Sequence, residues 1–304
     1  MASAVNHLRA ETAEELLFDR SFRTRWRLGF DKAIGWVLPL LFLVAIIPIL
    51  DLVYYIASQA LPTFTWTVLT STNPYDPDAL GVPIETTAAI MLFAIALAVL
   101  LGLFGGVATA EFLPERAAGW VRMAANMLVG TPSVVLGYFG YFLFVITFGW
   151  GLSFIAGSVT LAFFMTPYIF RISDLAYSSI PRPIREAAYG SGARPYQYVL
   201  RVGAPIAFPQ ILNGVFLALA IGVGETAPIV LTTTQSVIFP PTIYSPVTFL
   251  TGTIWENFSQ PAGSPSLSLA FQAALLLMVV VVALNILVRV ISARYQKRLE
   301  GLYQ

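Results

Sequence analysis

The feature that most constrains this chain is a series of long apolar stretches, almost free of charge and each long enough to cross a bilayer. Six of them stand out, at about Ile34–Ile56, Thr86–Ala110, Met123–Phe148, Leu152–Phe170, Gln210–Thr233 and Leu267–Val288. A membrane-spanning helix needs about 20 mostly apolar residues, whereas the strands of a membrane β-barrel alternate between apolar and polar side chains. The sequence therefore predicts an all-α, polytopic membrane protein with about six transmembrane helices.

The composition agrees with this prediction and excludes several functions. Only 11% of the 304 residues are charged, and the mean hydropathy is +0.76, whereas an ordinary soluble domain is about 25% charged. The formal net charge of +1 gives no indication of a nucleic-acid partner. The chain has no cysteine, and His7 is its single histidine. We therefore expect no catalytic residue, no metal site and no cofactor.

The basic residues are distributed unevenly between the apolar stretches. All 17 lysines and arginines lie before the first stretch, between the second and third, between the fourth and fifth, or after the sixth. If six spans alternate, these four segments lie on one side, and the opposite loops carry only acids: Asp76, Asp78, Glu85 and Glu256. The positive-inside rule then places both termini in the cytoplasm. We expect cytoplasmic tails at 1–33 and 292–304 around a single transmembrane domain at 34–291.

The two longer loops on the acidic side, Ala57–Glu85 and Thr234–Ser266, are rich in proline, threonine and serine. These residues favour turns, so the sequence predicts irregular structure in both loops. Such loops serve either as plain connectors or as docking surfaces for an external partner.

The longest cytoplasmic segment, at 171–209, has the pattern of a helix–turn–helix. Prolines stop the preceding helix, a short helix can form over Ile184–Ser191, and Gly192 allows a sharp turn before Pro195 begins a second helix. From these residues alone, the segment is either a coupling element for a cytoplasmic partner or an amphipathic loop that lies on the lipid headgroups.

One carboxylate, Glu225, falls inside the fifth apolar stretch. A charge at the centre of a membrane helix costs roughly 2.5–3.5 kcal/mol on insertion scales, so it should face protein or water. Glu225 is then either a carboxylate of a transport pathway or a group whose salt bridge or hydrogen bond fixes helix packing. An ion-coupled carrier that uses Glu225 as a proton site is an alternative function. An intramembrane enzyme is disfavoured, because the spans hold no paired carboxylates, Ser–His pair or metal cluster.

The cytoplasmic segment resembles the EAA loop of bacterial ABC-importer permeases, whose pattern is E-A-A, three residues, G, nine residues and I-x-L-P. Glu186-Ala187-Ala188, Gly192 and Val202-Gly203-Ala204-Pro205 keep this spacing, with valine for isoleucine and alanine for leucine. The resemblance implies that Glu186, Ala187 and Ala188 form a face that docks into a cytoplasmic ATPase, with Gly192 at the turn. The only lysines, Lys32 and Lys297, do not lie in a P-loop motif, so a separate subunit must hydrolyse ATP.

The run Gly224-Glu225-Thr226-Ala227-Pro228 is similar to the phosphate-import permeases of the PstA type, whose paralogue is PstC. Further residues agree: Thr131–Val135, Arg171, Arg185 directly before the EAA triplet, and Leu284–Arg289. This resemblance implies a type-I-like ABC importer permease fold and inorganic phosphate as the substrate. It adds Arg185 to the docking residues and implies a substrate pathway that contains Glu225, Thr226, Arg171 and Ser133.

The chain departs from this family at one position. Members usually carry an arginine four residues before the glutamate, where this chain has Ile221. An anionic substrate favours fixed cations along its route, so we expect the partner permease to supply the charge, or this half to play a reduced part. We also expect a basic partner for Glu225. The partners implied are a PstC-like permease, a PstB-like ATPase dimer and a PstS-like external phosphate-binding protein, assembled at the plasma (inner) membrane of a prokaryote.

Overall fold

The computed structural model describes residues 22–73, 79–236 and 238–300, with side chains described at 34–73, 79–236 and 238–291. The chain divides into two units, the first ending at Tyr55 and the second beginning at Ile56, and each is described by itself. The first unit contains most of helix α2, Phe22–Ala60. From Ile34 onward, apolar side chains are exposed on all sides of this helix, which suits a helix in lipid or against another subunit.

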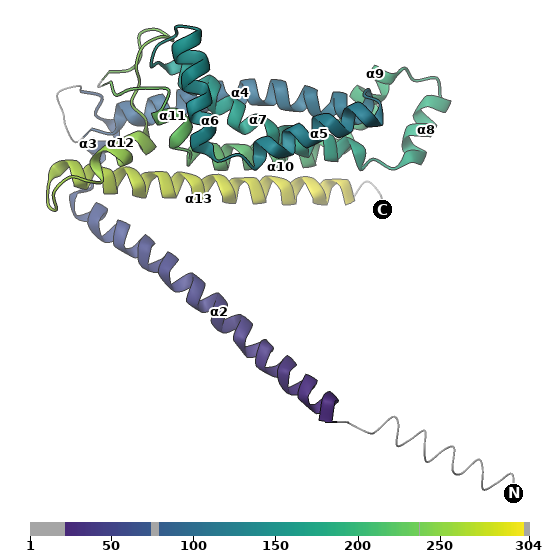
Figure 1. Cartoon of the computed structure of the whole chain (residues 1–304), viewed down its shortest axis with the longest axis horizontal. Helices are drawn as coiled ribbons and strands as arrows, with labels where there is room; N and C mark the ends of the chain where they lie inside the picture. The colour runs from purple at the N-terminus through teal and green to yellow at the C-terminus, as the bar shows by residue number, and fades with distance from the viewer. Residues whose placement is uncertain (1–21, 74–78, 237, 301–304) are drawn as a thin grey trace, which may run out of the picture. The chain divides into compact units, whose positions relative to one another are not determined.

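The second unit is a bundle of helices joined by short connections (Figure 1). The elements that follow α2 are η1 Leu61–Thr63, α3 Trp66–Thr70, α4 Gly81–Glu111, α5 Glu115–Val129, α6 Ser133–Gly140, η2 Tyr141–Thr147, α7 Phe154–Ser178, α8 Arg182–Gly190, α9 Pro195–Gln197, η3 Tyr198–Gly203, α10 Ala204–Val223, α11 Ala227–Val230, α12 Leu250–Asn257 and α13 Pro265–Glu300. Among the described residues, every regular element is a helix.

Five helical stretches in the described ranges are long and apolar enough to cross a membrane: Ile34–Thr63, Gly81–Glu111, Phe154–Ser178, Pro195–Val223 and Pro265–Ile291. A bent pair, Glu115–Val129 with Ser133–Thr147, raises the number to six if it is counted as one span. The all-α architecture and the expected number of spans are therefore confirmed.

The third apolar stretch is not the continuous helix expected over Met123–Phe148. Its two halves, α5 and α6 with η2, meet at an angle of 101°. Pro132 has an extended backbone, with a ψ of 134°, at the start of α6. Because proline lacks an N–H group and disfavours helical geometry in the residue before it, the helix breaks between Gly130 and Pro132.

The fourth and fifth spans have different bounds from those expected. Helix α7 continues past Phe170 to Ser178, so Arg171 is helical and does not belong to a loop. Helical turns begin again at Pro195, well before the expected start at Gln210. The fifth span ends at Val223, which leaves Glu225 in a break before α11 and not at the centre of a helix.

The two loops expected to be irregular also contain helices. The first contains η1 and α3, and the second contains α12. In α12, Leu250 is buried in one cluster with Leu269 and Ala273 of α13. Burial of this apolar face stabilises a helix that the turn-forming residues around it conceal in the sequence.

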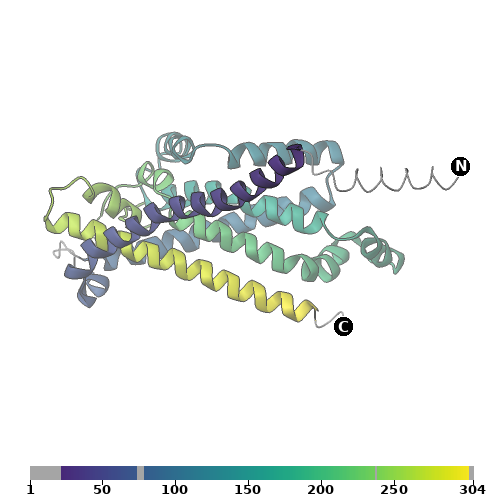
Figure 2. The same cartoon turned by 90° about the horizontal axis from the view of Figure 1, so that it is seen from below.

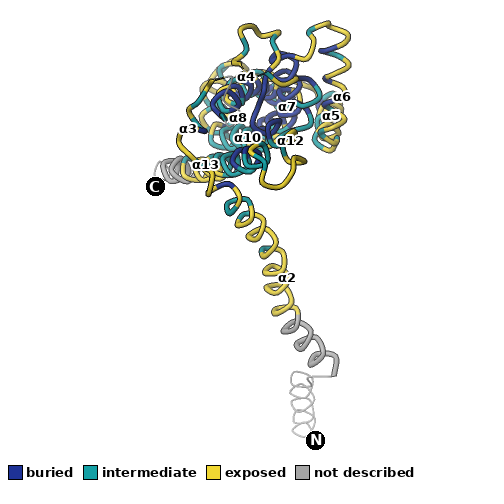
Figure 3. The backbone as a smooth tube through the Cα atoms, turned by 90° about the vertical axis from the view of Figure 1, so that its left-hand side faces the viewer, coloured by how far each residue is buried: buried dark blue, intermediate teal, exposed yellow. Residues whose placement is uncertain are grey.

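Helix α7 lies at the centre of the second unit and packs between α4 and α10 (Figure 3). Helices α4, α7, α10 and α13 run side by side in both Figure 1 and Figure 2. Helices α8 and α9 lie at one end of this bundle, and α3 and α12 lie at the opposite end. The bundle therefore separates the EAA-like segment from the loops on the acidic side.

Candidate functional site

The EAA-like segment folds as two helices around a turn, as the sequence predicted. Helix α8 covers Arg182–Gly190 and has a proline in its first turn, and α9 begins at Pro195. Between them, the Gly192 amide donates to the Tyr189 carbonyl at 2.9 Å, and the Ala193 amide donates to the Ala188 carbonyl at 3.1 Å. These bonds satisfy carbonyls at the end of α8 and close the turn.

Helix α8 has one face against the bundle and one face free. Ile184 and Ala188 are half-buried and pack against a cluster that includes Val107, Tyr177 and Tyr198. Glu186 and Ala187 lie on the exposed side. The structure therefore leaves Glu186 and Ala187 accessible to a partner, whereas Ala188 also contributes to anchoring the helix.

Arg185 points inward, unlike its neighbour Glu186. Its Nη2 atom lies 2.7 Å from the Glu111 Oε1 atom at the end of α4. Its Nε atom donates to the Tyr198 hydroxyl at 3.4 Å, and its guanidinium lies 5.6 Å from the centre of the Tyr198 ring. The Tyr198 hydrogen bond, aided by the Glu111 charge, raises the pKa of Arg185 above its ordinary value, so this side chain stays cationic. Arg185 holds α8 in place and is not part of its free face.

Sequence reasoning did not single out Glu111, which lies far from Arg185 along the chain. Its side chain is only 4% exposed, and Arg185 is its ion-pair partner among the described residues. A carboxylate directly after a long apolar stretch is the one signal that could have drawn attention to it. Sequence alone could not pair it with Arg185, because the pairing depends on how α4 and α8 pack.

Gly192 offers a test of the turn. Its φ is +83°, in the left-handed region that L-residues avoid, whereas Gly190 at the end of α8 has no such angle. We expect Gly192→Val to strain the turn by about 1–2 kcal/mol and to weaken binding of the cytoplasmic ATPase. Co-purification of the ATPase with the variant measures this loss.

Gly190→Val is the matched control for Gly192→Val. No atom lies within 4 Å of an added Cβ at either glycine, so the two sites differ in backbone angle and not in the space for a Cβ. We expect Gly190→Val to retain the ATPase. If Gly192→Val retains it equally well, the turn does not need a left-handed residue.

Glu225 lies in a break between α10 and α11, where the helical hydrogen bonding stops. The Gly224 amide donates to the Ile221 carbonyl and the Glu225 amide to the Gly222 carbonyl, both at 3.1 Å, which ends α10 in a tight turn. The Thr226 carbonyl then accepts from the Val230 amide at 2.9 Å, which begins α11. Thr251 of α12 donates from its hydroxyl to the Glu225 carbonyl at 3.0 Å. Two glycines and a proline in this run account for the break.

The structure brings together some of the residues expected in a substrate pathway. Ser133, at the start of α6, is a hydrogen-bonding partner of the Glu225 side chain. Gly137 of α6 approaches Ala227 of α11 so closely that an added Cβ would lie 2.8 Å from the Ala227 carbonyl oxygen. The close approach of α6 to α11 therefore places Ser133 beside Glu225 and Thr226.

Arg171 is exposed on α7 and forms no ion pair within the part of the chain that the structure describes. Tyr168, three residues earlier on α7, is near enough to Glu225 for an electrostatic interaction. The described residues also provide Glu225 with no basic partner. Arg171 and Glu225 thus remain separate features in this subunit.

A second ion pair that the sequence did not indicate joins α5 to α7. The Arg122 Nε atom lies 2.8 Å from Asp174 Oδ2, and its Nη2 atom lies 2.9 Å from Asp174 Oδ1. Asp174 is buried, and Arg122 also lies 3.3 Å from the exposed Glu115. This bidentate contact holds α5, the first helix of the bent pair, against the central helix α7.

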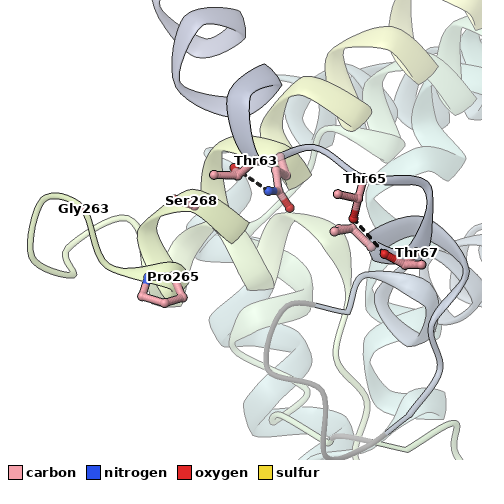
Figure 4. A pocket seen from close by; sticks show the side chains of 8 residues that line it. Thr63, Thr65, Thr67, Gly263, Pro265 and Ser268 are labelled. Atoms are coloured by element: carbon pink, nitrogen blue, oxygen red, sulfur yellow. Dashed lines mark hydrogen bonds between the residues drawn. The ribbon is translucent and has the colours of Figure 1, made fainter.

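At the opposite end of the bundle from α8, a cavity of about 450 Å³ lies between η1, α3 and the start of α13. Figure 4 shows its lining of hydroxyl groups, of which Thr65 and Thr67 bond to each other at 2.8 Å. Buried Gln272 of α13 donates to the Thr63 hydroxyl, also at 2.8 Å. The Gln272 bond ties the segment after α2 to α13.

Comparisons with known proteins agree with this geometry. Residues 98–297 match the family model described as binding-protein-dependent transport system inner membrane component. The phosphate transport system permease protein PstA 2 of Mycobacterium bovis is 34% identical over 258 residues, which cover 84% of this chain and 85% of that protein. The probable ABC transporter permease protein YqgI of Bacillus subtilis is 29% identical, over 69% of this chain and 76% of that protein.

The fold is also similar to that of a solved transporter. A chain of a bacterial ABC transporter involved in the import of the acidic polysaccharide alginate superposes with a TM-score of 0.56 at 17% identity. The match covers 88% of this chain and 99% of the other. At this identity the likeness shows the fold of an ABC importer permease.

Proposed function

Because this chain belongs to the family of binding-protein-dependent transport system inner membrane components, we propose that it is one permease half of an ATP-driven importer of inorganic phosphate. It is a multi-pass, non-catalytic membrane subunit, so the substrate crosses unchanged. The observation that carries the proposal is helix α8, which presents Glu186 and Ala187 to the exterior while Arg185 and Ile184 anchor it. A short, anchored helix that exposes one carboxylate and a small alanine side chain suits coupling to a separate ATPase.

Phosphate as the substrate is supported by the similarity to PstA 2 and by the run Gly224–Pro228 that surrounds Glu225. The same similarity supports a PstC-like second permease, a PstB-like ATPase dimer and a PstS-like external binding protein as partners. Ile221 stands where a fixed cation would favour an anion, and the described residues offer no basic group to Glu225. In this proposal the second permease contributes the positive charge of the pathway.

The proposed mechanism is alternating access driven by rigid-body movement of two permease halves. The ATPase closes on ATP and moves α8, and the external protein delivers phosphate at the end of the bundle where α3 and α12 lie. The segment around α8 and α9 carries four arginines: Arg182, Arg185, Arg194 and Arg201. This positive charge supports a cytoplasmic position for the α8 end of the bundle and for both termini. Arg171, Ser133, Glu225 and Thr226 remain the proposed pathway residues.

The test uses the complete transporter in liposomes, with ATP hydrolysis and phosphate uptake measured together. We expect the unaltered transporter to take up phosphate only with the ATPase subunit present. Glu186→Ala should lower phosphate uptake about tenfold, because the docking face loses its carboxylate. Glu115→Ala removes another exposed glutamate, at the start of α5 and outside both proposed docking surfaces, so it is the matched control and should transport normally.

Three results would contradict all or part of the proposal. Phosphate uptake driven by a proton gradient without any ATPase would instead identify an ion-coupled carrier that uses Glu225. Normal uptake by Glu186→Ala would show that α8 is not the coupling element. A transporter that hydrolyses ATP in response to another solute, and not to phosphate, would keep the importer assignment and remove phosphate as the substrate.

A further inference from the structure

We propose that helix α4 transmits movement of α8 to the backbone at Glu225, with Glu111 and Thr87 as positioning residues at its two ends. This inference rests on the proposed function, since it concerns how ATPase movement reaches the pathway. It adds residues that neither the sequence patterns nor the comparisons identify.

The first end of the connection is the contact of α8 with Glu111. Arg185 precedes the exposed Glu186 directly, so any displacement of the docking face displaces Arg185 as well. Its guanidinium lies 2.7 Å from the carboxylate of Glu111, which is almost fully buried as the last residue of α4. A buried carboxylate that loses its cation is strongly destabilised. Glu111 must therefore follow Arg185 when α8 moves.

The second end of the connection is the second turn of α4, which contacts the residues where α12 begins. The Thr86 hydroxyl donates to the Thr248 carbonyl, and the Leu250 amide donates to the Thr87 hydroxyl at 2.9 Å. One residue further along α12, the Thr251 hydroxyl donates to the Glu225 carbonyl at 3.0 Å. Thr86 and Thr87 of α4 thus hold the backbone at the start of α12, where the Thr251 side chain bonds to the break at Glu225.

The helix between these two ends has the properties of a rigid link. It contains 31 residues without an interior proline break, so it is about 46 Å long at 1.5 Å per residue. Gly102 and Gly106 bring α4 directly against the backbone of α7. Because α4 is held along its length, movement at Glu111 reaches Thr86 and Thr87 and is not absorbed by bending.

The break at Glu225 is suited to receive such movement. Its backbone lacks the continuous helical bonds that would resist a shift, and its carbonyl is held from outside by Thr251. A displacement of α4 therefore changes the position of Glu225 relative to Ser133 on α6. In this proposal, the hydrogen bonds of Thr86 and Thr87 and the ion pair of Glu111 act together, although they lie at opposite ends of α4.

The first experiment exchanges the charges at the α8 end, in the complete transporter in liposomes. Arg185→Glu and Glu111→Arg should each lower the phosphate taken up per ATP hydrolysed by about tenfold. The double variant restores an opposite pair and should recover most of this ratio. Co-purification of the partner permease and the ATPase shows that each variant assembles. If both single variants assemble and keep the normal ratio, or if the double variant recovers nothing, the proposal is wrong.

The second experiment links the two ends. Thr87→Val removes the acceptor of the Leu250 amide while keeping the shape of the side chain, and Thr147→Val, an exposed threonine of η2, is its matched control. Thr87→Val and Glu111→Gln should each lower the uptake-to-hydrolysis ratio, and the double variant should be little worse than either. If the effects of the two single variants multiply in the double variant, the two ends of α4 act independently and the proposal is wrong.

The unaltered transporter and Glu186→Ala distinguish failure of this inference from failure of the proposed function. If phosphate uptake depends on ATP and on Glu186, but not on Glu111 and Thr87, the permease assignment stands and α4 is not the link. If the unaltered transporter does not couple phosphate uptake to ATP, the proposed function itself fails.

Discussion

Replacing Gly106 with valine should prevent α4 from packing against α7 and should yield little folded protein. An added Cβ at Gly106 would lie 2.6 Å from the Phe170 carbonyl oxygen and 2.8 Å from the Asp174 amide nitrogen. Both atoms belong to the backbone of α7, which cannot move aside as a flexible side chain can. Overpacking in a core costs typically about 1–3 kcal/mol and occasionally more, and valine adds two further methyl groups.

We expect the cost of Gly106→Val to lie at or above the upper end of that range. The yield of detergent-solubilised protein and its thermal unfolding midpoint measure the effect. Gly119→Ala is the control, because an added Cβ at Gly119 meets no atom within 4 Å. A Gly106→Val protein with normal yield and midpoint would mean that α4 and α7 do not pack as closely as described.

Replacing Asp174 with alanine should produce the second largest loss of stability. Asp174 receives two hydrogen bonds from Arg122, and its side chain is 12% exposed, against 31% for Arg122. Removing one member of a fully buried ion pair costs about 3–5 kcal/mol, because the remaining charge stays uncompensated. Since Arg122 is partly exposed and water can screen it, we expect roughly 2–3 kcal/mol.

The same arginine provides the control for this experiment. Its other partner, Glu115, lies 3.3 Å away and is 92% exposed. Exposed ion pairs contribute little to stability, so Glu115→Ala should leave the unfolding midpoint almost unchanged. Equal midpoints for Asp174→Ala and Glu115→Ala would show that burial of Asp174 does not matter.

Gly106 and Asp174 attach α4 and α5 to α7, and this attachment also positions the candidate site. Gly106 of α4 lies against the backbone of Asp174, and Arg122 of α5 bonds to the side chain of the same residue. Helices α4 and α5 are therefore fixed to α7 at nearly the same position along it. Glu111 lies beyond this level at the end of α4, where α8 docks. A loosened α7 should therefore impair coupling as well as stability.

The sequence predicted those features that depend on local pattern. Long apolar stretches identified the membrane helices, and the positions of Pro183, Gly192 and Pro195 predicted a helix, a turn and a second helix. Each of these follows from hydrophobicity or from backbone preferences, which neighbouring residues determine. The role of Gly192 was predictable for the same reason, because few other residues adopt its left-handed angle.

Other features could not be read from the pattern. Apolar composition concealed the 101° bend at Pro132, because hydrophobicity does not record the direction of a helix. Hydrophobicity also placed Glu225 inside a span, whereas the glycines and the proline around it end the helix at Val223. The helix α12 was missed since its stability comes from burial against α13, which is distant in sequence.

By itself, the sequence determined a helical membrane protein with a helix–turn–helix segment between its fourth and fifth spans, since apolar length and local backbone preference are properties of short segments. The permease role followed from the resemblance to ABC-importer permeases. Only the tertiary structure decided which partners the charged side chains meet: Arg185 meets Glu111, Arg122 meets Asp174, and Glu225 meets the neutral Ser133. These pairs join residues that are far apart along the chain, and a charge in a protein interior is stable only beside the partner that packing brings to it. The few charges of this chain were visible from the start, but their partners depended on the fold.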